Sequence, residues 1–391
     1  MSKVLFLSAP AHGNVNPTLG LVSELVKQGE EVVYFSSTEF KEKIEATGAI
    51  FKCYNEDLDI FKGQGAIAPM HRVIKAAPEI IADILDQVKD IRFDYLIHSA
   101  AFPFTRIIAH VLNLPTVSSL AIFAGLGQIL DKINGLKTFP GAEEMMKTYQ
   151  GVAQIIEEKY SVEMPDMAMK LIFNKGIINL VYTSKYFAPD PEFFDDSYKF
   201  VGPPIYTRKE NLDFPFEKLQ GKKVIYISLG TVFSNYSLDL YEIFFKAFAD
   251  MDAVIVLAAY KVDVTQFDIP ANFIVRNYVP QSALLQYTDV AITHAGMNSI
   301  SDLISGHIPF VAIPLGADQP VLAKRAEELG AAIALDVKTL NPEVLRGAVE
   351  KVLAEPSYLE NIKKIAHSFE QAGGYAKAVE EIFSMKKAIG I

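Results

Sequence analysis

Short apolar runs alternate with amphipathic stretches along most of the chain. Runs of this length are typical of inner strands of a parallel sheet, and the stretches between them carry helical periodicity. The first run is followed by residues 9–17, a predicted loop, and then by a helix at residues 18–28. The alternation predicts two doubly wound α/β domains. The predicted strands cover residues 4–7, 31–35, 93–98, 116–120 and 177–182 in the first half, and 224–229, 254–257, 273–276, 290–293 and 310–313 in the second.

At 391 residues the chain exceeds what one hydrophobic core usually organises. Residues 201–221 are rich in proline and charge, which indicates a linker between the two domains. We expect a helix at the C-terminus, and one possible arrangement is that it packs back on the N-terminal domain. The expected parts are an N-terminal domain at residues 1–205, a linker at 206–220, a C-terminal domain at 221–372 and a C-terminal helix at 373–391.

The composition of the chain excludes several classes of binding partner and cellular compartment. Half of the residues are hydrophobic, and the formal net charge is −10 with no block rich in lysine or arginine. This charge argues against nucleic acid and anionic membranes as partners, because both need a basic footprint. Cys53 is the single cysteine, so an internal disulfide is excluded and a reducing compartment is expected. No run is long enough to span a membrane, and Pro10 and His12 interrupt the N-terminal apolar run, so we expect a cytoplasmic protein without membrane insertion.

Residues 289–302 read as a buried strand, a tight turn and the start of a helix. Gly296 lets the backbone turn closely, and Asn298 and Ser299 have side chains suited to capping the first N–H groups of the helix. Helix N-termini attract anions, and His294 adds a donor that can be charged. The stretch therefore predicts a phosphate or diphosphate site. An ordinary capped turn with a core histidine is the other interpretation.

Four loops of the second half follow predicted strands, where a doubly wound sheet binds its ligands. They are Ser228-Leu-Gly-Thr231, Tyr278-Val-Pro-Gln281, residues 289–302 and Pro314-Leu-Gly-Ala-Asp-Gln319. In order and spacing they resemble the nucleotide-sugar-dependent glycosyltransferases of the GT-B fold, family 1, close to the bacterial macrolide and flavonoid glycosyltransferases. Residues 11–13 (Ala-His-Gly) and 16–17 (Asn-Pro) echo the same family. The resemblance implies two Rossmann-like domains that face each other across a cleft.

The resemblance also implies a role for each loop. The base of UDP would stack on Tyr278 and bond the backbone of Val279, with Gln281 near the ribose. Asp318 and Gln319 would bind the sugar hydroxyls, although a helix cap is the other reading of Asp318. Asp302 stands where relatives commonly have a longer glutamate on the ribose, so either the donor sits deeper or a water bridges the gap. The diphosphate would be held by His294, Gly296, Asn298 and Ser299, with Ser228, Gly230 and Thr231 on its other side.

His12, after the first predicted strand, is the candidate catalytic base. A neutral imidazole there could take the proton from an acceptor hydroxyl as that oxygen attacks the anomeric carbon. Many relatives orient this imidazole with an aspartate after the strand at residues 93–98, where this chain has Ser99. Serine can hydrogen-bond His12 but cannot stabilise its positive charge. The neighbouring His98 is expected to point elsewhere, because side chains alternate across a strand.

The expected activity is transfer of a hexose, with inversion, from a UDP-sugar to a hydroxyl of a hydrophobic small molecule such as a macrolide or flavonoid. No metal or cofactor is expected, and the protein would be a monomer or homodimer. The helical residues 121–175 could cover the acceptor, or they could be packed core helices. The alternatives are a non-catalytic glycosyltransferase-like helper and a nucleotide-sugar epimerase or hydrolase. The candidate acceptor contacts are Phe102, Phe123 and Met145.

Overall fold

The computed structural model describes residues 1–59, 67–121, 141–205, 213–230 and 238–391. The chain divides into two compact units. The first contains Met1–Tyr182, Glu192–Pro204 and Ala372–Ile391, and the second contains Thr183–Pro191 and Ile205–Gln371. The C-terminal segment of the chain thus belongs to the unit that begins it.

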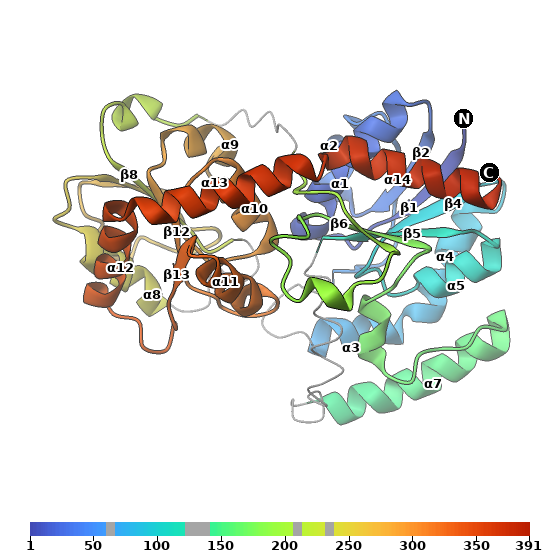
Figure 1. The fold of residues 1–391 in the computed structure, drawn as a ribbon. Coiled ribbons are helices and arrows are strands. Elements are labelled where there is room, and N and C mark those ends of the chain that lie inside the picture. The colour runs from blue at the N-terminus through green and yellow to red at the C-terminus, as the bar shows by residue number, and fades with distance from the viewer. Residues whose placement is uncertain (60–66, 122–140, 206–212, 231–237) are drawn as a thin grey trace. The chain divides into compact units, whose positions relative to one another are not determined.

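Within the described residues, the first unit holds a seven-stranded sheet in the order β3-β2-β1-β4-β5-β6-β7, and every neighbouring pair is parallel (Figure 1). The five strands predicted in this half are confirmed. The sequence missed β3 and β7, which are the two edge strands and are only partly buried, so they lack the continuous apolar run of an inner strand. The strands are β1 (Lys3–Leu7), β2 (Glu31–Ser36), β3 (Ile50–Cys53), β4 (Tyr95–Ser99), β5 (Thr116–Leu120), β6 (Ile178–Val181) and β7 (Tyr198–Phe200).

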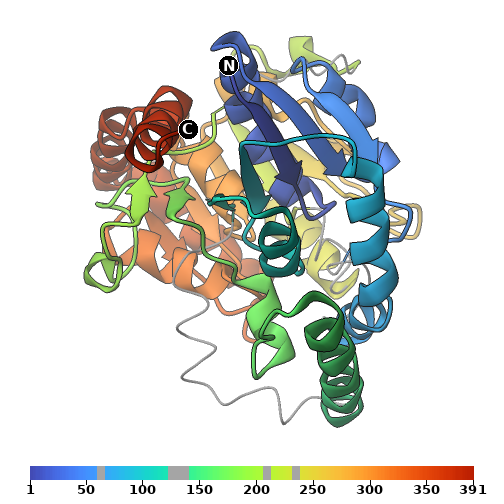
Figure 2. The ribbon, with the colours of Figure 1, turned by 90° about the vertical axis from the view of Figure 1, so that its right-hand side faces the viewer.

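Helices cover this sheet on both faces. Helix α14 lies along α1, and α7 lies beside α3 (Figures 1 and 2). The helical segments are α1 (His12–Lys27), η1 (Thr38–Phe40), α2 (Lys41–Glu45), α3 (Ile67–Lys75), α4 (Ala77–Val88), α5 (Thr105–Leu112), α7 (Ala142–Tyr160), η3 (Ala168–Ile172), η4 (Pro191–Phe193) and α14 (Gly374–Ile389).

Helix α1 begins at His12, so the loop predicted over residues 9–17 is wrong in its second part. Pro17 lies inside the helix although it cannot donate a backbone hydrogen bond. A contact from α14 holds this turn, because the Tyr375 hydroxyl donates to the carbonyl of Pro17 at 2.7 Å. The Tyr375 ring also lies where a β-carbon at Gly20 would be. Tertiary packing has therefore overridden the local preference of proline.

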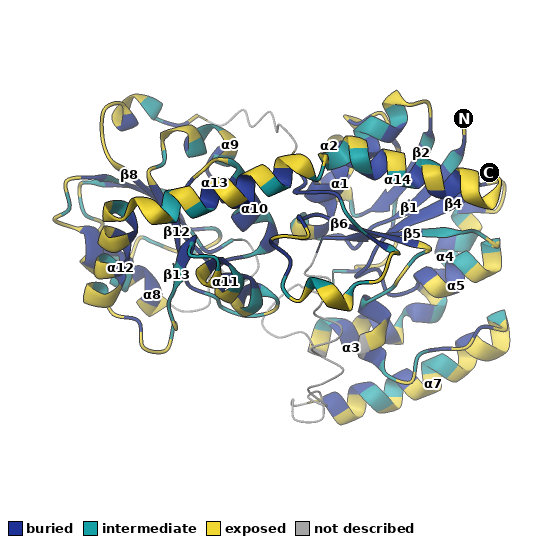
Figure 3. Cartoon of the chain, viewed as in Figure 1, coloured by how far each residue is buried: buried dark blue, intermediate teal, exposed yellow. Residues whose placement is uncertain are grey.

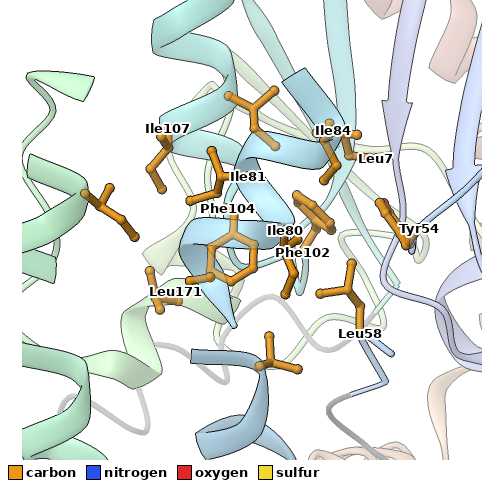
Figure 4. Close-up of a cluster of buried hydrophobic side chains, with 14 of the residues drawn as sticks. Leu7, Tyr54, Leu58, Ile80, Ile81, Ile84, Phe102, Phe104, Ile107 and Leu171 are labelled. Atoms are coloured by element: carbon orange, nitrogen blue, oxygen red, sulfur yellow. The ribbon is translucent and has the colours of Figure 1, made fainter. Parts of the chain in front are cut away.

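Alternate residues of the strands serve the two faces of the sheet. Leu5 and Leu7 of β1 belong to a buried cluster with α3, α4, α5 and α7, part of which Figure 4 shows. Phe6 faces the other side, where its ring stacks on Tyr34 with centroids 4.3 Å apart. Tyr34 in turn shares a 2.7 Å hydrogen bond with Thr18 of α1. The central strands β1 and β4 are accordingly buried, apart from the partly buried Lys3 that begins β1 (Figure 3).

In the described residues, the second unit holds a six-stranded parallel sheet in the order β10-β9-β8-β11-β12-β13. The five strands predicted here are confirmed. The short β13 was missed because its three residues, Ala-Ile-Ala, carry no pattern of their own. The strands are β8 (Val224–Ser228), β9 (Val254–Ala258), β10 (Phe273–Arg276), β11 (Val290–Thr293), β12 (Phe310–Ala312) and β13 (Ala332–Ala334).

The core of the second unit packs β8, β9 and β11 against α8 and α12. The helical segments are η5 (Phe216–Leu219), α8 (Leu238–Phe248), α9 (Gln281–Leu284), η6 (Leu285–Tyr287), α10 (Met297–Ser305), α11 (Gln319–Glu328), α12 (Pro342–Ala354) and α13 (Pro356–Gln371).

In both sheets the strand order reverses at the first strand of the unit, which confirms the predicted doubly wound class. In the first unit β1 lies between β2 and β4, and in the second unit β8 lies between β9 and β11. Ligands of such sheets bind at the carboxyl ends of the strands at this reversal. The loops beside this reversal include those after β1, β2 and β4 in one unit, and those after β8 and β11 in the other.

Candidate functional site

The turn between β11 and α10 is built around a glycine cap. Gly296 is the N-cap of α10, and Ala295 before it has a left-handed backbone, with φ of 65°. Asn298 and Ser299 lie inside the first turn of the helix and not at its cap, so the expected capping role belongs to Gly296 instead. Left-handed alanine is unfavourable, and strained backbone of this kind concentrates at functional sites. The turn has the form of an anion site at a helix N-terminus.

His294 packs against two glycines that come from different loops. A β-carbon at Gly230 would lie 2.6 Å from its Nε2 atom, and one at Gly296 would lie 2.5 Å from the same atom. Burial lowers the pKa of His294 to about 4. The sequence allowed for a charged donor here, whereas in the folded protein His294 is a neutral imidazole near pH 7. A hydrogen bond to the backbone of Ser228 opposes this shift, and it uses the one N–H that a neutral imidazole has.

The loop after β8 approaches this imidazole from the neighbouring strand. β8 and β11 pair in parallel, with Ser228 opposite Thr293. Gly230 has φ of 73°, a conformation that favours glycine, and its N–H donates to the Ser228 hydroxyl at 3.4 Å. The loops that carry Ser228, Gly230 and His294 thus meet at the point where the sheet reverses. Thr231 lies outside the described residues.

The loop after β10 presents an aromatic ring to solvent. Tyr278 is 43% exposed, while Val279 beside it is buried. The side-chain oxygen of Asn277 accepts a hydrogen bond from the backbone N–H of Lys261 at 2.7 Å, which fixes the start of the loop. An exposed aromatic face on a fixed loop is suited to stacking against a planar base.

Gln281 and Asp302 lie together, and a tyrosine from the sheet supports them. Gln281 donates from Nε2 to the Asp302 carboxylate at 2.7 Å and accepts at Oε1 from the Tyr226 hydroxyl at 2.9 Å. Both ends of the Gln281 amide are therefore engaged. The sequence alone gives no signal for Tyr226, because a tyrosine within a strand looks like a core residue. This arrangement orients the carboxylate of Asp302.

The loop after β12 places Asp318 and Gln319 at the start of α11. Asp318 is the N-cap residue, but its side chain makes no capping hydrogen bond, which weakens the alternative that it serves as a helix cap. Gln319 is buried, and its Oε1 accepts from the N–H groups of Leu315 and Gly316 at 2.8 and 3.1 Å. Gln319 can therefore offer a sugar hydroxyl its amide N–H, and Asp318 can offer a carboxylate oxygen.

In the first unit, His12 is the first residue of α1. Its Nε2 atom lies 3.0 Å from Oε1 of Glu39, and its ring meets that of Phe40 edge-on. Ser99 is buried and donates its hydroxyl to Oδ1 of Asn14 at 2.8 Å. The group that meets the His12 imidazole in these contacts is thus a carboxylate from η1, and the Ser99 hydroxyl is engaged by Asn14.

Sequence reasoning missed Glu39, although a signal was present. Glu39 follows a predicted strand by a few residues, and neighbouring strands of a doubly wound sheet bring the loops at their carboxyl ends together. His98 is fully buried, and its Nδ1 lies 3.0 Å from the carbonyl of Ser99. Since Ser99 reaches α1, His98 points to the other face of β4, as the alternation predicted.

The candidate acceptor residues have structural roles. Phe102 is 0% exposed and Met145 is 2% exposed, and both belong to the buried cluster that contains Leu5 and Leu7. Figure 4 shows Phe102 within this cluster. The Phe102 ring stacks on Tyr54 with centroids 5.7 Å apart. Core packing accounts for both residues without a ligand. Phe123 lies outside the described residues.

The described part of the chain contains neither a metal-ligand cluster nor a membrane-spanning helix. No group of three or more histidine, cysteine, aspartate or glutamate side chains is placed to hold a metal ion there. Nor does that part contain a helix of the length and apolarity that crossing a membrane requires.

Comparison with known proteins agrees with this geometry. Residues 200–371 match the family model described as UDP-glucoronosyl and UDP-glucosyl transferase. The chain is 35% identical to the uncharacterized UDP-glucosyltransferase YdhE of Bacillus subtilis (strain 168), over 98% of each chain. It is 25% identical to the oleandomycin glycosyltransferase of Streptomyces antibioticus, over 97% of this chain and 90% of that protein. Among solved structures, the glycotransferase of kitacinnamycin superposes with a TM-score of 0.85 at 25% identity, over 98% of each chain.

Proposed function

Because the chain belongs to the UDP-glucoronosyl and UDP-glucosyl transferase family and is a glycosyltransferase of the GT-B fold, we propose that it moves a hexose from a UDP-sugar to a hydroxyl of a hydrophobic small molecule. His12 acts as the general base, and the anomeric centre inverts. One observation carries the donor part of this proposal. A neutral His294 is wedged between Gly230 and Gly296 at the N-terminus of α10, where the second sheet reverses.

The donor is bound by groups matched to its parts. The Tyr278 ring stacks on the uracil, Asp302 accepts hydrogen bonds from the ribose hydroxyls, and the turn at Gly296 binds the diphosphate. Asp318 and Gln319 bind the hydroxyls of the sugar. These are the chemical matches that each part of a UDP-sugar requires: an aromatic face, a carboxylate, a helix N-terminus and a carboxylate–amide pair.

The reaction is a single displacement. The acceptor oxygen loses its proton to the imidazole of His12 and forms a bond to the anomeric carbon, while the bond from that carbon to the diphosphate oxygen breaks. The electron pair leaves with UDP, whose charge the N-terminus of α10 stabilises. Attack opposite the leaving group inverts the anomeric centre. The names of the oleandomycin and kitacinnamycin enzymes support a hydrophobic natural product as acceptor.

The test of this proposal separates catalysis from donor binding. With UDP-glucose and a panel of macrolides and phenols, His12→Ala should lower transfer by at least 100-fold, since general base catalysis contributes about 10²–10⁴. The Kd for UDP, measured by calorimetry, should stay within about twofold. His110→Ala, an exposed histidine of α5, is the matched control and should transfer normally.

Three results would contradict the proposal. An equal loss of UDP affinity in His12→Ala would place His12 in the donor site. Product that keeps the α-configuration of the donor, seen by NMR, would exclude the single displacement. Consumption of UDP-glucose at full rate with no acceptor present would instead indicate a hydrolase or epimerase.

A further inference from the structure

The imidazole of His12 faces a carboxylate from the loop after β2. Its Nε2 atom lies 3.0 Å from Oε1 of Glu39, and Phe40 packs edge-on against the ring with centroids 5.0 Å apart. We propose that Glu39 is the positioning residue that orients His12 and stabilises the positive charge the imidazole acquires when it takes the acceptor's proton. This inference rests on the proposed function, because it assigns a role to a partner of the proposed base.

The fold explains why the carboxylate can come from this side. β1 has two parallel neighbours, with Leu7 opposite Phe35 of β2 and opposite His98 of β4. The loops after all three strands therefore leave the same edge of the sheet. His12 follows β1, so a carboxylate from either neighbouring loop can reach it. In this chain the loop after β2 supplies it, through the short η1 segment Thr38–Phe40.

The loop after β4 supplies no charge at this place. Ser99 is 1% exposed, donates its hydroxyl to Asn14 at 2.8 Å and accepts a hydrogen bond from the N–H of Ala101 at 3.3 Å. A serine engaged in this way fixes α1 on the sheet, and its neutral hydroxyl cannot balance an imidazolium. Glu39, in contrast, forms an ion pair with His12 when the imidazole is protonated.

The contact determines which nitrogen reacts. Glu39 accepts a hydrogen bond from Nε2–H, so the neutral ring carries its lone pair on Nδ1. During transfer the proton of the acceptor hydroxyl moves to Nδ1, and the resulting imidazolium is paired with the Glu39 carboxylate. The proton stays on the ring, because the carboxylate orients and stabilises but does not take it. The acceptor oxygen then bonds the anomeric carbon, and UDP leaves with the electron pair.

The solvent exposure of His12 and Glu39 limits the strength of their ion pair in the free protein. The side chains of His12 and Glu39 are 31% and 63% exposed. Solvent screens such a pair, so it is weaker than a buried one. A hydrophobic acceptor that covers the pair would displace this solvent and strengthen the attraction. The contribution should therefore be larger in kcat than in the stability of the free protein.

The first measurement follows the pair without turnover. In protein labelled with ¹³C in its histidine rings, the His12 resonance is assigned from its absence in His12→Ala, and its pKa is read from a pH titration. Glu39→Gln should lower the pKa of His12 by about half a unit or more, because an adjacent carboxylate favours the charged form. Glu39→Asp should lower it less. The matched control is Glu42→Gln, an exposed carboxylate of α2, which should leave it within about 0.2 units.

The second measurement is kinetic. Glu39→Gln should lower kcat for transfer by roughly 10- to 100-fold, with KM for UDP-glucose unchanged, and should move the pH at which the rate reaches half its maximum downward with the pKa. Glu39→Asp should recover part of kcat. Glu42→Gln should keep the wild-type rate. The structural alternative, a surface ion pair with no catalytic role, predicts none of these kinetic changes.

The outcomes test the role of Glu39 separately from the role of His12 as the base. An unchanged pKa of His12 in Glu39→Gln would show that the pair does not form in solution and would overturn the role of Glu39. A lowered pKa with unchanged kcat would overturn it as well. If His12→Ala transfers sugar normally, the proposed base itself is wrong, and the titration still reports whether the pair exists.

Discussion

The imidazole of His294 fills the space in front of Gly296: a β-carbon at Gly296 would lie 2.5 Å from Nε2 of the histidine. The backbone of Gly296 is ordinary, with φ of −66° and ψ of 146°, so alanine could adopt it without strain. The glycine is therefore needed for the space it leaves and not for its conformation. Gly230 leaves space for the same ring from the other loop.

We predict that Gly296→Ala lowers the affinity for UDP by at least tenfold, because His294 must rotate away from the start of α10. Since a terminal ring atom can move, the free energy of unfolding should fall only moderately, by about 1–2 kcal/mol. Urea unfolding and calorimetry measure the two quantities. A variant that binds UDP normally would show that the position of the His294 ring is not part of the donor site.

Gly347 of α12 is the matched control for this substitution. It lies in the same unit, and a β-carbon there would meet nothing within 4 Å. Gly347→Ala should raise the free energy of unfolding by about 0.5–1 kcal/mol, as expected for alanine inside a helix, and should leave UDP binding unchanged.

Asp302 gives a prediction about the ribose. Its carboxylate is oriented by Gln281, which is itself held by Tyr226. If Asp302 accepts hydrogen bonds from the ribose hydroxyls, wild-type protein should bind UDP about tenfold more tightly than 2′-deoxy-UDP, since a hydrogen bond to a charged group contributes about 1.5–3 kcal/mol. Asp302→Asn should reduce this ratio to about threefold or less. Tyr226→Phe should have a smaller effect in the same direction. Equal discrimination in the wild type and in Asp302→Asn would remove Asp302 from the ribose site.

The sequence predicted the inner strands well because an inner parallel strand must be apolar on both faces, and this leaves a continuous run. The edge strands β3 and β7 and the three-residue β13 have no such run, and only their pairing in the sheet makes them strands. The start of α1 was misplaced for a related reason. Local preference ends a helix near Pro17, whereas the contact with Tyr375, distant in sequence, holds that turn.

The site was predicted one loop at a time, which is why single-loop features were found and contacts between loops were not. His294 and Gly296 share a turn, so their association could be read from the sequence. The contacts that join different loops could not be read in this way. They are the packing of His294 between Gly230 and Gly296, the hydrogen bond from Tyr226 to Gln281, and the pair of His12 with Glu39. Each of these contacts depends on the strand order and on the length of a side chain, and a local sequence pattern shows neither of these two properties.

Two histidines with lowered pKa values predict how the stability of the protein depends on pH. Burial lowers the pKa of His98 and of His294 to about 4, from an ordinary value near 6.5. Between these values the unfolded chain binds protons that the folded protein does not, so the free energy of unfolding falls as the pH falls from about 6.5 to 4. For His98, which is fully buried, the loss at pH 4 is of order 3 kcal/mol.

This pH dependence can be measured by urea unfolding at several pH values. His98→Leu should have a smaller slope than the wild type between pH 6.5 and 4, by close to one proton. The leucine variant is informative because Nε2 of His98 has no hydrogen-bond partner in the described structure, and the histidine keeps only the bond from Nδ1 to Ser99. Identical slopes would mean that His98 protonates in the folded protein.

A buried ion pair joins the C-terminal helix α14 to the rest of the first unit. Nζ of Lys386 lies 2.7 Å from Oε1 of Glu30, and the Tyr95 hydroxyl donates to Oε2 at 3.0 Å. Only 10% and 3% of the lysine and glutamate side chains are exposed. Burial beside Glu30 raises the pKa of Tyr95 well above its ordinary value, so its hydroxyl stays protonated and continues to donate.

Removing one member of this pair should cost far more than removing both. Lys386→Met leaves the Glu30 carboxylate buried without its cation, and the free energy of unfolding should fall by about 3–5 kcal/mol. Adding Glu30→Gln should recover a large part of that loss, because the amide oxygen still accepts from Tyr95 and no charge remains. Lys387→Met, at the adjacent exposed lysine of α14, should change stability by no more than about 0.5 kcal/mol. If Lys386→Met and Lys387→Met unfold alike, the Lys386–Glu30 pair does not hold this helix, and the apolar contacts of α14 do so alone.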